Sequence, residues 1–266
     1  MYEEFFLMKH TPFTNRIPTQ YLYLSDAISE GLGRLCYAAD QQLFAVVTAQ
    51  VGCGKTTLIR RLTDSLDTEA YLVLYLSDSQ LTPRWFYNGL LQQLGTETKF
   101  YRGDAKLSLH QQLEYIRQVK HKKVVTIVDE AHLLKRETLE EIRFMLNYQM
   151  DSFNPMSLIL VGQDELWDKL NLQAYAAVRQ RIDLKCELPA FDRSQVEAYM
   201  HAHLAYADGD KEIFTDKAID EIYQYSTGSA RAINKVCTHS LLSASQRNKK
   251  LIDDHMVHMV IESELP

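Results

Sequence analysis

The chain has 266 residues and a formal net charge of −6, which excludes a protein that is strongly basic on average, as many nucleic-acid binders are. A hydrophobic content of 46% with 24% charged residues is ordinary for a soluble globular protein. The cysteines stand far apart without a C-x-x-C pair, so the sequence indicates neither a zinc site nor a disulfide framework.

The first ten residues, MYEEFFLMKH, carry two early acids and no sustained apolar run, so they are not a signal peptide. No apolar stretch further along approaches the roughly 20 residues that a membrane span needs. We therefore predict a cytoplasmic protein without membrane contact, which agrees with cysteines kept reduced.

Five short runs rich in β-branched or aromatic residues predict strands at 43–48, 71–76, 124–128, 157–161 and 182–188. The first four are nearly continuous apolar runs, which is typical of strands buried on both faces of a parallel sheet. Stretches with helical spacing lie between them, at 56–66, 82–95, 107–119 and 136–150. This alternation predicts an α/β domain with a five-stranded parallel sheet flanked by helices.

After Pro189 the pattern changes to helices alone, predicted at 191–207, 215–228, 229–247 and 252–264. Asp192 and Thr215 are typical helix starts, and Gly228 is a typical helix end. We therefore predict an α/β domain over 1–189, whose residues 1–40 form an N-terminal segment, and a small all-helical lid domain over 190–266.

The stretch AQVGCGKTT, 49–57, follows the first strand and departs at one position from the phosphate-loop pattern Gly-x₄-Gly-Lys-Ser/Thr, because Ala49 replaces the first glycine. A chance match is the alternative, but the place between a strand and a helix favours a nucleotide site, since backbone N–H groups there attract phosphate. Lys55 is expected on the β- and γ-phosphates and Thr56 on Mg²⁺. The predicted nucleotide contacts of the loop are Gln50, Val51, Gly52, Cys53, Gly54, Lys55, Thr56 and Thr57.

The stretch VVTIVDEAH, 124–132, is a strand that ends in two acids, as in a Walker B motif. Asp129 is expected to hold Mg²⁺, and Glu130 to deprotonate the attacking water. Two solvated acids at a strand tip are the alternative. The paired acids favour hydrolysis over a small-molecule P-loop kinase, because a kinase gives its phosphate to a substrate hydroxyl and need not activate water.

Four further polar residues follow predicted element ends. Gln163 follows the fourth strand, where it could touch the γ-phosphate and the attacking water. Arg179 and Arg181 precede the fifth strand, and Arg181 is the preferred candidate for an arginine finger that acts on a neighbouring subunit. Arg231 begins a lid helix and could report the nucleotide state as a lid rotation. Solvated surface side chains are the alternative for all four.

These elements, in this order, resemble the AAA+ ATPases over nearly the whole chain. The N-terminal stretch MYEEFFLMKHTPFTNRIPTQYLYLSDAISE and the later VDEAH, LVGQDEL, RQRI and TGSARAIN stretches narrow the resemblance to the ExeA-type family. That family includes secretion-system assembly ATPases and ATPase partners of DNA transposases, similar to the TnsC and MuB type.

The resemblance implies a P-loop AAA+ fold with ATP and Mg²⁺ as cofactors. It implies that Gln163 is sensor 1, Arg181 or Arg179 the finger and Arg231 sensor 2, with Pro12 and Phe13 near the adenine. Ala49, and Ala230 in place of the usual proline before the sensor arginine, depart from the family pattern.

The secretion members carry a membrane span and a cell-wall-binding domain after the ATPase, and this sequence shows neither. We therefore expect the transposition role, in which the ATP-bound chain assembles on target DNA and activates a transposase. A secretion or protein-remodelling ATPase is the first alternative, and a small-molecule P-loop kinase is the remote one.

The charge distribution supports the expected DNA role. Residues 79–123 hold eight lysines and arginines against three acids, and 228–250 hold five against none. Solvated helix faces are the alternative. The expected partners are double-stranded DNA bound without sequence preference, a transposase and further copies of the chain in a ring or helical filament. The DNA-facing candidates are Arg84, Lys99, Arg102 and Lys106.

Overall fold

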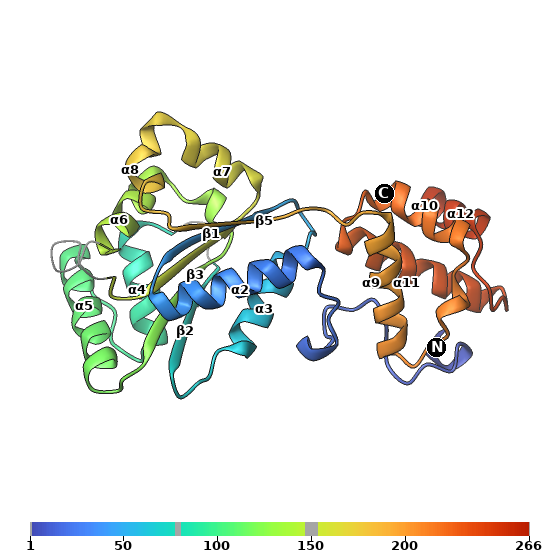
Figure 1. The fold of residues 1–266 in the computed structure, drawn as a ribbon, viewed down its shortest axis with the longest axis horizontal. Helices are drawn as coiled ribbons and strands as arrows, with labels where there is room; N and C mark the ends of the chain where they lie inside the picture. Colours follow the sequence, from blue (N-terminus) through green and yellow to red (C-terminus); the bar gives the residue numbers. More distant parts are fainter. Residues whose placement is uncertain (1, 78–80, 147–153, 266) are drawn as a thin grey trace. The chain divides into compact units, whose positions relative to one another are not determined.

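The computed structural model describes residues 2–77, 81–146 and 154–265. Its contacts divide the chain into two compact units (Figure 1). The sheet unit comprises Ser29–Ala49 and Leu58–Leu188. The helical unit comprises Met1–Ile28, Gln50–Thr57 and Pro189–Pro266. Each unit is built around its own buried side chains, and each is described by itself below.

The sheet unit contains a five-stranded parallel sheet, as predicted. Its strands are β1 (Phe44–Ala49), β2 (Tyr71–Leu76), β3 (Lys123–Val128), β4 (Ser157–Gly162) and β5 (Leu184–Leu188). Their order is β2-β3-β4-β1-β5, with every pair parallel. Every residue of β1 and β4 is buried, whereas the edge strand β2 is only partly buried. The apolar runs therefore mark the central strands, as expected for a sheet covered on both faces.

Helices connect the strands of this unit. They are α2 (Asp26–Gln41), which begins in the helical unit, α3 (Lys55–Ser65), α4 (Pro83–Gln93), α5 (Arg102–Gln118), α6 (Arg136–Leu146), α7 (Asp164–Asn171) and α8 (Ala176–Arg179), with the 3-10 turns η2 (Ala131–Leu133) and η4 (Gln173–Tyr175). The helix predicted at 136–150 begins at Arg136, and its residues 147–150 lie outside the described ones.

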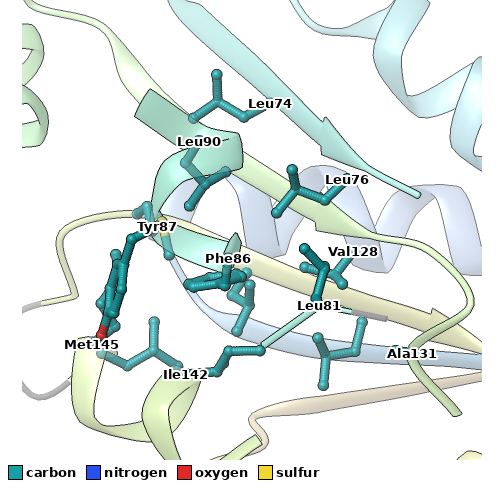
Figure 2. Packing of buried hydrophobic residues seen from close by; sticks show 14 of the residues in the cluster. Leu74, Leu76, Leu81, Phe86, Tyr87, Leu90, Val128, Ala131, Ile142 and Met145 are labelled. Carbon is teal, nitrogen blue, oxygen red and sulfur yellow. The ribbon is translucent and has the colours of Figure 1, made fainter. Parts of the chain in front are cut away.

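The core of the sheet unit lies between one face of the sheet and α4 to α7. Leu74 and Leu76 of β2 pack there with Phe86 and Leu90 of α4 and Ile142 of α6 (Figure 2). Alternate strand residues point to the other face and are buried as well, and α2 and α3 lie on that side (Figure 1). With both faces covered, functional side chains gather at the strand ends.

The helical unit is built from α9 (Arg193–Tyr206), α10 (Asp216–Ser226), α11 (Ala230–Gln246) and α12 (Asp254–Glu264), together with α1 (Tyr2–Phe5), η1 (Thr19–Tyr21) and η5 (Lys211–Ile213). The predicted helix starts appear as caps. Asp192 forms a capping box with Gln195, and the Thr215 hydroxyl accepts from the Ala218 backbone N–H. The helical C-terminal portion is thus confirmed.

The N-terminal segment packs on the helices of the helical unit. The Lys9 backbone N–H donates to the Ala207 carbonyl at 2.8 Å, and the Phe13 N–H donates to His203 Nδ1 at 3.1 Å. The sequence predicts residues 1–40 as part of the α/β domain, whereas Met1–Ile28 group here with Pro189–Pro266. Burial of Tyr2, Phe6 and Phe13 explains the difference, because these aromatic side chains fill space against the helices.

Candidate functional site

Residues 50–54 connect β1 to α3, and the phosphate-loop residues 50–57 belong to the helical unit. Gly52 and Gly54 have φ angles of +83° and +91°, a backbone region that favours glycine. Ala49, which departs from the pattern, is the last residue of β1 and is 1% exposed. Its methyl group, which a glycine would lack, is therefore packed in the interior. Cys53 is buried at 5% exposure, and Thr56 and Thr57 lie in the first turn of α3.

The amine of Lys55 turns back onto its own loop. Its Nζ donates to the Gln50 carbonyl at 3.0 Å. The first turn of α11 meets the same loop, since Ser229 Oγ donates to the Val51 carbonyl at 3.3 Å and the Arg231 N–H points to the Gly52 carbonyl at 3.4 Å. A Cβ on Gly52 would stand 2.4 Å from Ser229 Oγ, so glycine is required at this approach. Arg231, an exposed residue, therefore begins its helix beside the phosphate loop.

Two acids stand at the carboxyl end of β3, in the sheet unit. Asp129 Oδ2 accepts a hydrogen bond from the Tyr75 hydroxyl at 2.6 Å, and Asp129 Oδ1 accepts from the Glu130 N–H at 2.8 Å. Glu130 has a φ angle of +51° and caps η2, and its side chain is 43% exposed. Carboxylate oxygens oriented in this way suit a hard cation such as Mg²⁺.

Gln163 follows β4 and is linked to Glu130 by His132, which was not among the residues predicted from the sequence. His132 of η2 lies with Nδ1 3.5 Å from Glu130 Oε2 and with Nε2 3.1 Å from Gln163 Nε2. The signal was present in the stretch VDEAH, because an imidazole two residues after the second acid remains near it. Tyr75 was also missed, because it lies 54 residues before Asp129.

The two finger candidates lie on either side of the end of α8. Arg179 is its last residue, and its Nη1 donates to the Asn171 carbonyl at 2.9 Å. Arg181 lies in the turn before β5 and is partly buried. The fifth strand begins at Leu184 rather than at 182, because Asp183 turns its side chain back to accept from the Phe44 N–H.

Three of the four DNA-facing candidates make side-chain contacts within the sheet unit, and Lys99 is contacted through its backbone. Arg102 and Lys106 both pair with Glu141, at 3.4 and 3.2 Å. The guanidinium of Arg84 lies 4.8 Å from the Phe100 ring centroid, and its Nε donates to the Lys99 carbonyl at 3.4 Å. The positive charge predicted from the sequence is therefore partly neutralised by an acid on α6.

The adenine candidates Pro12 and Phe13 are both buried in the helical unit. The Phe13 ring stacks on His203, with centroids 5.4 Å apart and an angle of 12° between the planes. Phe13 therefore lies against α9 in the helical unit. In the sheet unit, Asp129, Glu130 and Gln163 lie at the edge where β3 and β4 end.

Residues 38–170, half of the chain, match the model of a known family, the AAA domain. The chain belongs to this family. It is therefore an ATPase of the AAA+ P-loop type, which confirms the coarser part of the resemblance.

Among curated proteins, the chain is 32% identical over 260 residues to general secretion pathway protein A of Aeromonas hydrophila. The match covers 95% of the chain but 46% of that relative, so the chain spans about half of the relative's length. This relative supports the secretion-type alternative better than the transposition role that we expected first. In the described ranges no helix combines the length and hydropathy of a membrane span.

Solved structures show the same fold at low identity. The Aeropyrum pernix ORC1 protein in complex with DNA aligns at a TM-score of 0.68 with 15% identity, covering 92% of this chain and 67% of that one. The Thermotoga maritima RuvB Holliday junction branch migration motor aligns at 0.60 with 17% identity, covering 90% and 68%. At these identities the likeness shows the fold of the chain alone.

Proposed function

We propose that the chain binds ATP with Mg²⁺, hydrolyses ATP to ADP and phosphate, and uses this cycle in a general secretion pathway. The placement of Asp129, Glu130 and Gln163 carries the ATPase part, because they follow β3 and β4 at the sheet edge where the phosphate loop leaves β1. The Aeromonas relative carries the secretion part, since its match extends over almost the whole chain.

The residues fit ATP and Mg²⁺ by their chemistry. The loop supplies two glycines at positive φ and the first N–H groups of α3, which suit phosphate oxygens. The Thr56 hydroxyl and the Asp129 carboxylate are hard oxygen donors of the kind Mg²⁺ takes. When bound, Mg²⁺ would neutralise charge on the phosphates. Pro12 and Phe13 are proposed to face the adenine.

Hydrolysis then uses the protein's own side chains. Glu130 takes a proton from a water molecule, and the oxygen of that water bonds to the γ-phosphorus. At the same time the bond between the γ-phosphorus and the bridging oxygen breaks, and ADP leaves with that oxygen. Lys55 leaves the Gln50 carbonyl for the phosphates, because an anion is a stronger partner for an ammonium group. Gln163 contacts the γ-phosphate, and Arg231 approaches it from the first turn of α11.

Two substitutions separate binding from hydrolysis. Lys55→Ala should abolish measurable ATP affinity in titration calorimetry. Glu130→Gln should retain ATP and lower turnover by about 10²–10⁴-fold, the usual loss of a general base. Equal ATP affinity of wild type and Lys55→Ala would exclude the proposed loop, and wild-type turnover in Glu130→Gln would exclude the proposed base.

The secretion role is tested in the host cell. Deletion of the gene should retain exported proteins inside the cell, and the wild-type chain should restore their export. The Lys55→Ala and Glu130→Gln variants should be produced to the same level without restoring export. Unchanged export after deletion would remove the secretion role and leave the ATPase untouched.

A second candidate function is ATP-dependent binding of duplex DNA for a transposase. The ORC1 neighbour was solved in complex with DNA, and the sequence between 79 and 123 is locally basic. Filter binding with a non-hydrolysable ATP analogue should then show affinity that falls steeply with salt. Lys99→Ala should weaken it, whereas Lys217→Ala on α10 is the matched control. No binding at low salt would remove this candidate.

A further inference from the structure

Three large aromatic side chains are exposed where α4 and α5 begin. Phe100 is 72% exposed, and Tyr101, the residue before α5, is 67% exposed, with the two ring centroids 5.1 Å apart. Trp85, in the first turn of α4, is 50% exposed. Burial of apolar surface is the main favourable term in folding, so exposed rings that lie together indicate a surface for interaction.

The guanidinium of Arg84 joins these rings into one surface. Its central carbon lies 4.8 Å from the Phe100 ring centroid and 5.5 Å from the Trp85 ring centroid. Phe100 in turn contacts Tyr101. Arg84, Trp85, Phe100 and Tyr101 are called the aromatic patch below. The patch combines apolar rings with a cation that lies against two of them.

A buried amide holds the backbone of the patch in place. Asn88 of α4 is fully buried, and its side chain bonds both backbone groups of Lys99. Its Nδ2 donates to the Lys99 carbonyl at 3.0 Å, and its Oδ1 accepts from the Lys99 N–H at 2.9 Å. Arg84 Nε donates to the same carbonyl. The residue before Phe100 is therefore fixed to α4, so the exposure of the two neighbouring rings is a feature of the fold.

The charge around the patch is positive but small. Arg84 and residues 97–106 carry four cations and two acids, and Glu141 on α6 pairs with two of those cations, Arg102 and Lys106. A surface of this kind complements an anionic partner, but it provides few phosphate contacts for duplex DNA. The Phe100 and Tyr101 rings stand at 87° to each other, so they do not form the parallel platform on which successive bases stack.

We propose that the aromatic patch is a contact surface for a membrane that contains anionic lipids. Aromatic rings with a polar or charged neighbour are favoured at the membrane interface, where apolar and wet surroundings meet. The rings enter the headgroup boundary, and Arg84 pairs with lipid phosphates. The chain then lies on the membrane without spanning it. The sequence prediction of no membrane contact considered only spanning stretches, which a surface contact does not require.

Vesicle binding tests the proposal with the full chain and without nucleotide. The probes are vesicles of phosphatidylcholine alone and of an equimolar mixture with phosphatidylglycerol. The chain should float with the mixed vesicles and much less with phosphatidylcholine alone. It has two tryptophans, Trp85 and Trp167, and Trp167 packs against the buried core of the sheet unit. In Trp167→Phe the fluorescence reports Trp85 alone, and its emission should shift to the blue with the mixed vesicles.

Two substitutions separate the rings from the charge. The double variant Phe100→Ser with Tyr101→Ser should raise the Kd for mixed vesicles by about 10-fold or more, because two rings no longer leave water. Arg84→Gln should lower the preference for mixed over neutral vesicles. Tyr37→Ser, at an exposed ring on α2, is the control and should bind as the wild type does. Equal melting temperatures of the variants and the wild type exclude a folding defect as the cause.

Three outcomes would overturn the proposal. The first is no flotation of the wild type with mixed vesicles, and the second is equal vesicle binding by the wild type and the double variant. The third is a loss of DNA binding or of self-association in the double variant while the wild type ignores vesicles, which would assign the patch to nucleic acid or to a second copy. Because the assay needs no nucleotide, vesicle binding by a chain without ATPase activity would reject the proposed function alone.

Discussion

Tyr75, on the strand next to β3, orients the carboxylate of Asp129, which we propose as a ligand of Mg²⁺. Its hydroxyl donates to Asp129 Oδ2, while the Glu130 N–H holds Oδ1, so both oxygens of Asp129 are directed. Burial, and then the adjacent Asp129 carboxylate, raise the pKa of Tyr75 well above its usual value. The hydroxyl therefore stays protonated and donates to Asp129 around neutral pH.

The first residue-scale prediction concerns this hydroxyl. Tyr75→Phe should raise the Mg²⁺ concentration for half-maximal ATP turnover by about 10-fold, since loss of a partner that orients a ligand commonly costs 10–100-fold in metal affinity. Turnover at saturating Mg²⁺ should persist, because Glu130 is unchanged. Tyr71→Phe, on the same strand but bonded to Asp40, is the control. An identical Mg²⁺ dependence in Tyr75→Phe would contradict the assignment.

Sequence reasoning could locate the residues that follow strands but not the partners that orient them. Asp129, Glu130 and Gln163 were selected because parallel strands bring their carboxyl ends to one edge. Tyr75, His132 and Ser229 were not selected, because their roles depend on contacts with residues distant in the sequence. A tyrosine within a strand carries no local sign of which carboxylate it meets.

At the scale of elements, the strands followed from apolar runs and the lid helices from caps and periodicity. The helices α2 and α7 were not predicted from periodicity. The eight residues of α7 are too few to show a clear period. The N-terminal segment was assigned to the other unit, because only its tertiary contacts with α9 reveal where its aromatic side chains are buried.

The contact between the N-terminal segment and α9 predicts how the free energy of unfolding depends on pH. His203 is 2% exposed and accepts from the Phe13 N–H, and burial lowers the pKa of His203 to about 4. An unfolded histidine has a pKa of about 6.5. Between these values the unfolded chain binds a proton that the folded chain excludes. The free energy of unfolding should therefore fall as the pH drops from about 6.5 to 4, by up to about 3 kcal/mol.

Denaturant unfolding over this pH range measures the effect. In His203→Gln the amide oxygen still accepts from the Phe13 N–H but does not titrate, so its stability should depend less on pH than that of the wild type. Limited proteolysis should show the N-terminal segment released first as the wild type is acidified. The same pH dependence in both proteins would show that another group is responsible.

At the scale of the whole molecule, the comparison and the charge pattern favour different partners. The secretion-type relative matches over almost the whole chain, whereas two of the four basic candidates are paired with Glu141. Charge counted along a sequence ignores such pairing across helices, so part of the counted positive charge lies against an acid. The ATPase core is independent of this choice, since both roles require the same strand-end residues.

The proposed sharing of the active site between subunits gives the last prediction. β5 is an edge strand parallel to β1, and Leu188 pairs with Ala49, where the phosphate loop begins. Arg181 precedes the other end of β5, and five strand residues span about 17 Å at the usual rise. That distance is longer than an arginine side chain, and we propose that Arg181 acts on the phosphate loop of another copy of the chain.

Mixing two inactive variants tests this sharing. Arg181→Ala should lower turnover by about 10³-fold, as removal of an arginine finger does elsewhere, while ATP binding persists. Lys55→Ala keeps Arg181 but lacks a working loop, so a mixture of the two should recover turnover where an intact loop meets an intact arginine. Arg179→Ala serves as the comparison, because its guanidinium is held by Asn171. Full turnover in Arg181→Ala, or no recovery on mixing, would place the finger elsewhere.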